Sequence, residues 1–82
     1  MSETMTIADL VPDDTAAISG FSADGAHLRR FREMGLMKGT EIKVIRYAPL
    51  GDPIEILVRG ALLSIRNEEA CLIEVEKSIP GN

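Results

Sequence analysis

The chain contains 82 residues, of which 45% are hydrophobic and 27% charged, with one tyrosine and no tryptophan. The apolar share excludes wholesale disorder, and the length allows one domain with a thin core. Thirteen acidic residues against nine basic ones leave a formal net charge of −4. Because affinity for nucleic acid depends on basic side chains that meet the phosphate backbone, this balance argues against a general role in nucleic-acid binding.

Cysteine and histidine each occur once, as Cys71 and His27. An intramolecular disulfide is therefore excluded, and a metal site of these two side chains alone falls short of the usual four zinc ligands. The segment from Met1 to Thr6 carries an acid and no long apolar run, unlike a secretory signal. No stretch reaches the roughly 20 apolar residues of a membrane span. We expect a soluble, reduced, cytoplasmic domain without a cofactor.

The pattern along the chain predicts one domain at residues 6–77 between two flexible tails, residues 1–5 and 78–82. The domain opens with a capping-box sequence at Thr6–Asp9, which predicts a single helical turn that buries the apolar residues around it. Alternating apolar and polar residues at 15–20 then predict a strand.

A helix is predicted over residues 25–34, with Asp24 or Ser22 as its N-cap. Its buried stripe is expected to consist of Leu28, Phe31 and Met34. Gly35 is suited to the left-handed residue that ends a helix, and Leu36 can fold back onto the last turn in a Schellman motif.

Four further strands are predicted in the second half of the chain, at residues 41–47, 54–58, 61–65 and 72–76. The alternation fails at Ile45–Arg46, which predicts a bulge. A two-residue turn at Arg59–Gly60 would place Leu57 opposite Leu62. Residues 66–70 are expected to form one 3₁₀ turn. The inward residues of the last two strands are expected to be Ala61, Leu63, Ile65, Cys71, Ile73 and Val75. The chain is therefore predicted to be mainly β, a small barrel of about five strands with one inserted helix.

Several segments together resemble the FeoA family, in order and in approximate spacing. They are residues 28–36, 38–40, 48–53, 58–60, 64–70 and 73–75. The resemblance implies an SH3-like small barrel and a cytoplasmic accessory of FeoB, the membrane-bound ferrous-iron transporter with a GTP-binding domain. The chain departs from the family at Asp13–Asp14, where a glycine is usual, and at Lys38, where proline is frequent. Aspartate tolerates left-handed backbone geometry, so the turn can persist.

No catalytic constellation is present, and we expect that the chain is not an enzyme. His27 stands beside no nucleophile, and Cys71 is expected to act as a small buried apolar residue. The acidic pairs Asp13–Asp14 and Glu68–Glu69 are interpreted as solvated turns, because two adjacent acids alone do not make a cation site.

Two groups of residues remain as candidates for binding a partner. Arg29, Arg30 and Arg32 form a basic patch on the helix, either a solvated face in which Arg29 pairs with Glu33 or a docking surface. The outward leucines are Leu57, Leu62 and Leu72. They are either covered by other elements or form a contact patch, and the sequence favours neither.

We hypothesise that part of the leucine cluster and the rim of the helix bind FeoB. The protein is expected to bind no nucleic acid and not to insert directly into the membrane. Attachment to the inner membrane would then be peripheral, through FeoB. The alternative is a regulatory module that resembles the C-terminal SH3-like domain of iron-dependent repressors. Such a module normally follows a DNA-binding domain, and no recognition helix is expected before this barrel. A nucleic-acid-binding barrel would need basic and aromatic residues on one face, which this composition does not supply.

Overall fold

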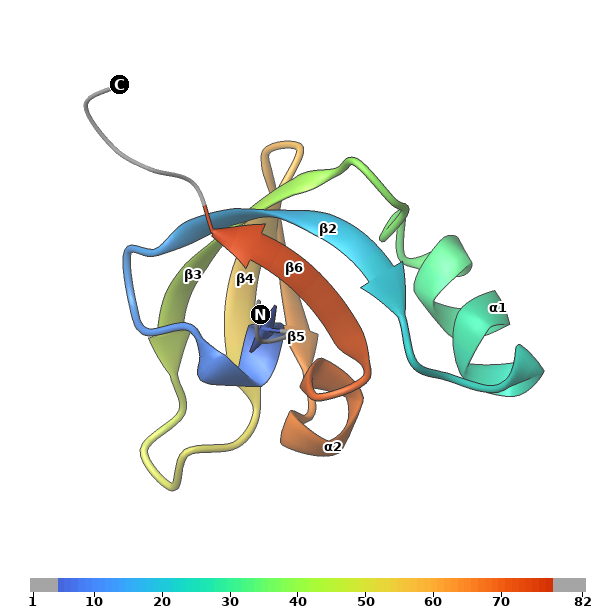
Figure 1. Ribbon diagram of the computed structural model, residues 1–82. Helices are drawn as coiled ribbons and strands as arrows, with labels where there is room; N and C mark the ends of the chain where they lie inside the picture. Colours follow the sequence, from blue (N-terminus) through green and yellow to red (C-terminus); the bar gives the residue numbers. More distant parts are fainter. Residues whose placement is uncertain (1–4, 78–82) are drawn as a thin grey trace.

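The computed structural model describes residues 5–77, which form six strands, two α-helices and one 3₁₀ turn (Figure 1). In chain order these are β1 (Met5–Thr6), the 3₁₀ turn η1 (Ile7–Asp9), β2 (Thr15–Phe21), α1 (Gly25–Glu33), β3 (Glu41–Tyr47), β4 (Ile54–Val58), β5 (Ala61–Ile65), α2 (Asn67–Ala70) and β6 (Ile73–Lys77). The predicted tail residues 1–4 and 78–82 lie outside the described part of the chain, whereas Met5 belongs to β1.

The strands form one antiparallel sheet in the order β1-β6-β2-β3-β4-β5, which curls into a small barrel (Figure 1). The predicted fold class is confirmed. The sheet has one strand more than predicted, because Met5 and Thr6 pair with Val75 and Glu74 of β6. A strand of two residues is too short to produce an alternating pattern, so only the tertiary pairing reveals it.

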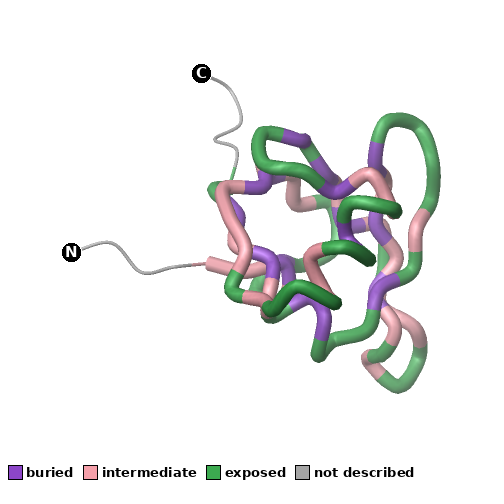
Figure 2. The backbone as a smooth tube through the Cα atoms, turned by 90° about the vertical axis from the view of Figure 1, so that its right-hand side faces the viewer, coloured by how far each residue is buried: buried purple, intermediate pink, exposed green. Residues whose placement is uncertain are grey.

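The core lies inside the curled sheet, and most of it comes from alternate positions of β2, β3, β4 and β6. Its fully buried large side chains are Phe31, Ile7, Leu10, Ile18, Leu36, Ile42, Ile54, Ile56, Ile65, Ile73 and Val44. Burial alternates along much of β2, β3, β4 and β6, whereas exposed stretches concentrate in the turns and on α1 (Figure 2). The capping box at Thr6 and Asp9 is present and brings the buried Ile7 and Leu10 into this core, as predicted.

Helix α1 begins and ends at the predicted signals. Asp24 accepts a hydrogen bond from the backbone N–H of His27 at 3.0 Å. At the other end Gly35 has φ +85°, and the N–H of Leu36 donates to the carbonyl of Phe31 at 2.9 Å, which completes the Schellman motif.

The predicted buried stripe of α1 is only partly correct. Phe31 is buried, but Leu28 and Met34 are half-buried. The physical reason is position: α1 stands to one side of the barrel beyond the end of β2 (Figure 1), and within the helix only Phe31 is fully buried. This incomplete cover leaves apolar surface beside the helix.

The second half of the sheet confirms the predicted register. The pairing of β3 with β4 shifts between Val44 and Arg46, at the predicted bulge. The turn residues Arg59 and Gly60 have φ values of +52° and +82°, and this turn sets Leu57 opposite Leu62. Positive φ at both central residues is the hairpin geometry that suits the twist of the flanking strands.

Three details of this half were predicted wrongly. β5 is the last strand of the sheet, so Ala61 is exposed and Leu63 is half-buried rather than inward. The turn after β5 is the short α-helix α2 rather than a 3₁₀ turn. Cys71 caps that helix and is exposed, because β6 begins only at Ile73 and the inward alternation starts there.

Candidate partner-binding surface

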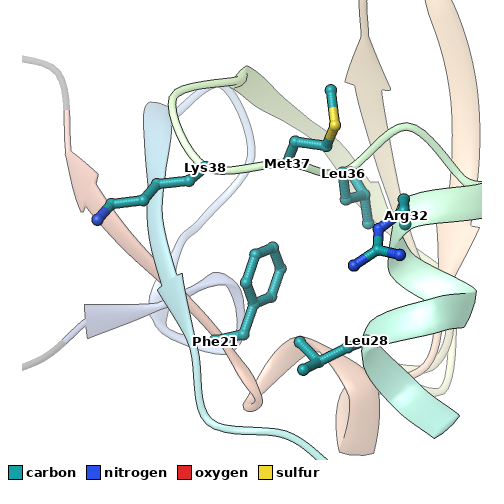
Figure 3. A pocket seen from close by; sticks show the side chains of 6 residues that line it. All are labelled: Phe21, Leu28, Arg32, Leu36, Met37 and Lys38. Atoms are coloured by element: carbon teal, nitrogen blue, oxygen red, sulfur yellow. The ribbon is translucent and has the colours of Figure 1, made fainter. Parts of the chain in front are cut away.

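An apolar hollow of about 220 Å³ opens between the end of β2 and α1. Phe21 and Leu28 face one another across it, and the segment after the helix forms its far wall (Figure 3). Its six lining residues are Phe21, Leu28, Arg32, Leu36, Met37 and Lys38. The volume is below the roughly 300–1,000 Å³ of sites that enclose small organic ligands, so the hollow is suited to a protruding side chain.

Local packing fixes the walls of this hollow. The ring of Phe21 stacks on the buried ring of Phe31, with centroids 5.7 Å apart and planes 22° from parallel. The Schellman hydrogen bond turns the chain back so that Leu36 is buried and Met37, 44% exposed, remains at the rim. The hollow is therefore a consequence of how α1 ends.

Basic side chains border the apolar floor. Arg32 turns its guanidinium toward the hollow, and Lys38 extends outward from the rim (Figure 3). Arg29 is exposed one helical turn before Arg32. Within the part of the chain that the structure describes, none of the three forms an ion pair, and the predicted pair of Arg29 with Glu33 is not formed.

Arg30, the remaining member of the predicted basic patch, has a partner. Its Nε donates a 2.5 Å hydrogen bond to Oε2 of Glu69 on α2. The interpretation of Glu68–Glu69 as a solvated turn is wrong for Glu69, whose side chain is only 10% exposed. The short helix α2 turns this carboxylate inward, where its other oxygen accepts from the backbone N–H of Arg66 at 3.0 Å.

Two opposing effects set the pKa of Glu69. Burial raises it, because a desolvated carboxylate loses its hydration. The hydrogen bond from the Arg66 backbone and the hydrogen bond and charge of Arg30 outweigh burial, so the pKa lies below the ordinary 4.5. Glu69 is thus ionised at neutral pH and attaches α1 to α2.

The three predicted leucines lie in two places. Leu57 and Leu62 face each other across β4 and β5; Leu57 is half-buried and Leu62 is 63% exposed. Leu72 follows α2, at the other end of β5, where it is half-buried and packs against the core. The structure therefore keeps Leu57 and Leu62 together as a cross-strand pair and places Leu72 apart from them, against the core.

The remaining polar candidates serve the fold. His27 is half-buried, with Nδ1 3.0 Å from Oδ1 of Asp24. Asp13 adopts φ +77°, the left-handed geometry expected where the family has a glycine. Asp14 accepts from the N–H of Val11 and pairs with Lys77, and these contacts hold the pKa of its carboxyl below its usual value.

Among residues 5–77, no group of three or more His, Cys, Asp or Glu side chains is placed to hold a metal ion. Likewise, none of the helices described is both long and apolar enough to cross a bilayer.

Sequence reasoning did not identify Phe21, Leu36, Met37 and Lys38 as residues that line a hollow. Each carried a signal: an aromatic residue at a strand end, and two apolar residues with a lysine directly after a helix stop. The hollow is formed only when β2, α1 and the following segment come together, and no periodicity within one element indicates that meeting.

Comparison with known proteins identifies the family. The model of the FeoA domain matches residues 5–77. A Porphyromonas gingivalis protein described as an Fe(2+) transport protein A/Fe(2+) transporter FeoB fusion is 36% identical over 72 residues, which are 88% of this chain and 8% of the relative. This chain thus spans a small part of that relative's length.

Solved structures agree with this family assignment. The FeoA protein of Chlorobium tepidum is 38% identical, with a TM-score of 0.85 over 95% of this chain and 74% of that one. A manganese-dependent transcriptional repressor aligns with a TM-score of 0.86 over 95% of this chain and 38% of its own, but at 20% identity it shows a shared fold alone. The chain belongs to the FeoA family of ferrous iron transport, and its barrel is SH3-like.

Proposed function

We propose that this protein is a cytoplasmic accessory of ferrous-iron uptake that binds the FeoB transporter and modulates it through protein contacts. The observation that carries the proposal is the fusion relative, in which one polypeptide joins a FeoA part to an Fe(2+) transporter. A genetic fusion keeps two domains at high effective concentration, which is useful when they act on one another.

The described surface supports a contact role rather than catalysis. The hollow beside α1 and the cross-strand pair of half-buried Leu57 and exposed Leu62 provide apolar area, and Arg29 and Arg32 provide exposed charge. Arg30 would contribute by holding α1 in place through Glu69. Leu72 would support the barrel end from which α2 and β6 extend.

An accessory that works through protein contacts affects transport by binding some states of the transporter more tightly than others. The test is capture of full-length FeoB in detergent by the immobilised full chain, with GTP, with GDP and without nucleotide. Association under at least one condition is expected. No association under any of the three would remove the proposal.

The alternative, a module of the iron-dependent repressor type, has the shared fold in its support. A filter-binding assay with double-stranded DNA at low salt separates the two. With a net charge of −4, this chain is expected to leave the DNA free.

A further inference from the structure

The hollow beside α1 combines an apolar floor with positive charge and contains no acid. Its lining has four apolar side chains and two cations, Arg32 and Lys38. A second hollow on the barrel, lined by Lys43, Arg59 and Leu57, differs because Glu41 also lines it. The first hollow therefore differs from the second in having only cations among its charged lining residues.

The cations around this hollow form no ion pairs with described residues, although the chain as a whole is acidic. Acidic residues outnumber basic ones by thirteen to nine, and Arg30, Arg46, Arg66 and Lys77 each have a carboxylate partner. Arg29, Arg32 and Lys38 have none among the described residues. The negative end of the helix dipole accounts for Arg32 in the last turn, but Lys38 lies outside the helix and Arg29 lies before that turn.

We infer that the hollow binds an acidic segment of the partner protein, with one aliphatic or aromatic side chain seated between Phe21 and Leu28. Carboxylates beside that side chain would meet Arg32, Lys38 and Arg29. Apolar contact at the floor supplies affinity, and the complementary charges set orientation and association rate. This inference rests on the proposed function, because the segment would belong to FeoB.

A lipid surface fits these observations less well. Attraction to anionic membranes usually requires clusters of about four to eight basic residues. Here three cations stand on a chain with net charge −4, which an anionic bilayer repels as a whole. A protruding side chain flanked by carboxylates matches both the volume and the charge.

The experiment measures binding of the full chain to detergent-solubilised full-length FeoB by biolayer interferometry, at increasing sodium chloride. Arg32→Glu and Lys38→Glu reverse the rim charges, and Met37→Gln removes rim apolarity at nearly constant size. Arg59→Glu is the matched control: it reverses an exposed cation on the β4–β5 hairpin that forms no ion pair with another described residue. All four side chains are exposed, so the thermal midpoints should stay close to that of the wild type.

We expect the two rim reversals to weaken FeoB binding about tenfold or more at low salt and to flatten its salt dependence. Met37→Gln should weaken binding by a smaller factor at every salt concentration, and Arg59→Glu should bind as the wild type. Equal losses for Arg59→Glu would reveal a general charge effect and overturn the inference.

Two further outcomes separate the inference from the function on which it rests. If the wild type binds FeoB and all four variants bind equally well, the proposed function stands and this site is wrong. If the wild type binds no FeoB, the proposed function and this binding site are both wrong. Phosphatidylglycerol vesicles form a parallel arm: wild-type binding to them that Arg32→Glu abolishes, with FeoB binding unaffected, would assign the hollow to lipid instead.

Discussion

The guanidinium of Arg30 on α1 donates from Nε to the carboxylate of Glu69 on α2, at 2.5 Å and across 39 positions of sequence. This contact and the burial of Phe31 attach the protruding helix to the barrel. Because α1 forms one wall of the hollow, the geometry of the candidate surface depends on an ion pair that does not itself line it.

Glu69→Gln should lower the free energy of unfolding by about 1–2 kcal/mol, because a charge-assisted hydrogen bond at a nearly buried site is weakened. Chemical denaturation in urea at pH 7 measures the loss. Glu68→Gln is the matched control, since the neighbouring Glu68 is exposed and should change stability little. Equal stability of Glu69→Gln and the wild type would show that the contact contributes nothing.

The same pair predicts a dependence on pH. The pKa of folded Glu69 lies below the ordinary 4.5, so as pH falls the unfolded chain takes up this proton first. The stabilising contribution is therefore complete above about pH 5 and is lost as pH falls through the lower folded pKa. The difference between wild type and Glu69→Gln should be largest at pH 7 and shrink below pH 5. A difference that stays constant from pH 7 to pH 3 would contradict this account.

Leu57→Lys and Leu62→Glu test whether the cross-strand pair of Leu57 and Leu62 binds FeoB. Leu62 is 63% exposed, so its substitution removes little buried area, and the stem of a lysine at position 57 can still cover the sheet. We expect FeoB binding to be lost while the thermal midpoint stays nearly unchanged. Leu50→Lys, at a 96% exposed loop leucine, is the control and should bind normally. A collapse of stability would show instead that the pair belongs to the core.

Gly35→Ala and Gly25→Ala form a matched pair at the two ends of α1. A methyl group at either position meets nothing within 4 Å, but only Gly35 has a positive φ, +85°. Gly35→Ala should therefore cost about 1 kcal/mol from backbone strain alone. Gly25→Ala should stabilise the protein by roughly 0.5 kcal/mol by reducing the entropy of the unfolded chain. Urea unfolding of both variants measures the contrast, and changes of equal sign would refute the backbone explanation.

Cys71 should react in the folded protein. Its thiol is exposed and donates to the carbonyl of Glu68 at 3.2 Å. With Ellman's reagent at pH 8, we expect one thiol to be labelled under native conditions about as fast as in urea. If labelling requires unfolding, Cys71 is buried in the folded protein, as the alternation of the last strand had predicted.

Local signals predicted the elements themselves. The Thr6–Asp9 capping box, the Gly35–Leu36 helix stop and the Arg59–Gly60 turn all form as expected, because each is decided by backbone conformation and hydrogen bonds within a few residues. Long alternating strands were equally clear, since one face of each is buried. The prediction that Cys71 is buried was wrong, because Cys71 precedes β6 and belongs to the end of α2.

The amino-acid sequence alone determined that this chain is a small, mainly β domain of FeoA type, poor in groups that could perform chemistry. Periodicity and turn chemistry are local properties, and they suffice to predict the mainly β domain; the FeoA type came from the resemblance of its segments to that family. Only the tertiary structure decided that the Glu69 side chain is buried, that Leu72 packs against the core, and that a charged hollow lies beside α1. Each depends on which residues of distant segments meet, and that meeting is set by the closure of the barrel and by where α1 docks against it.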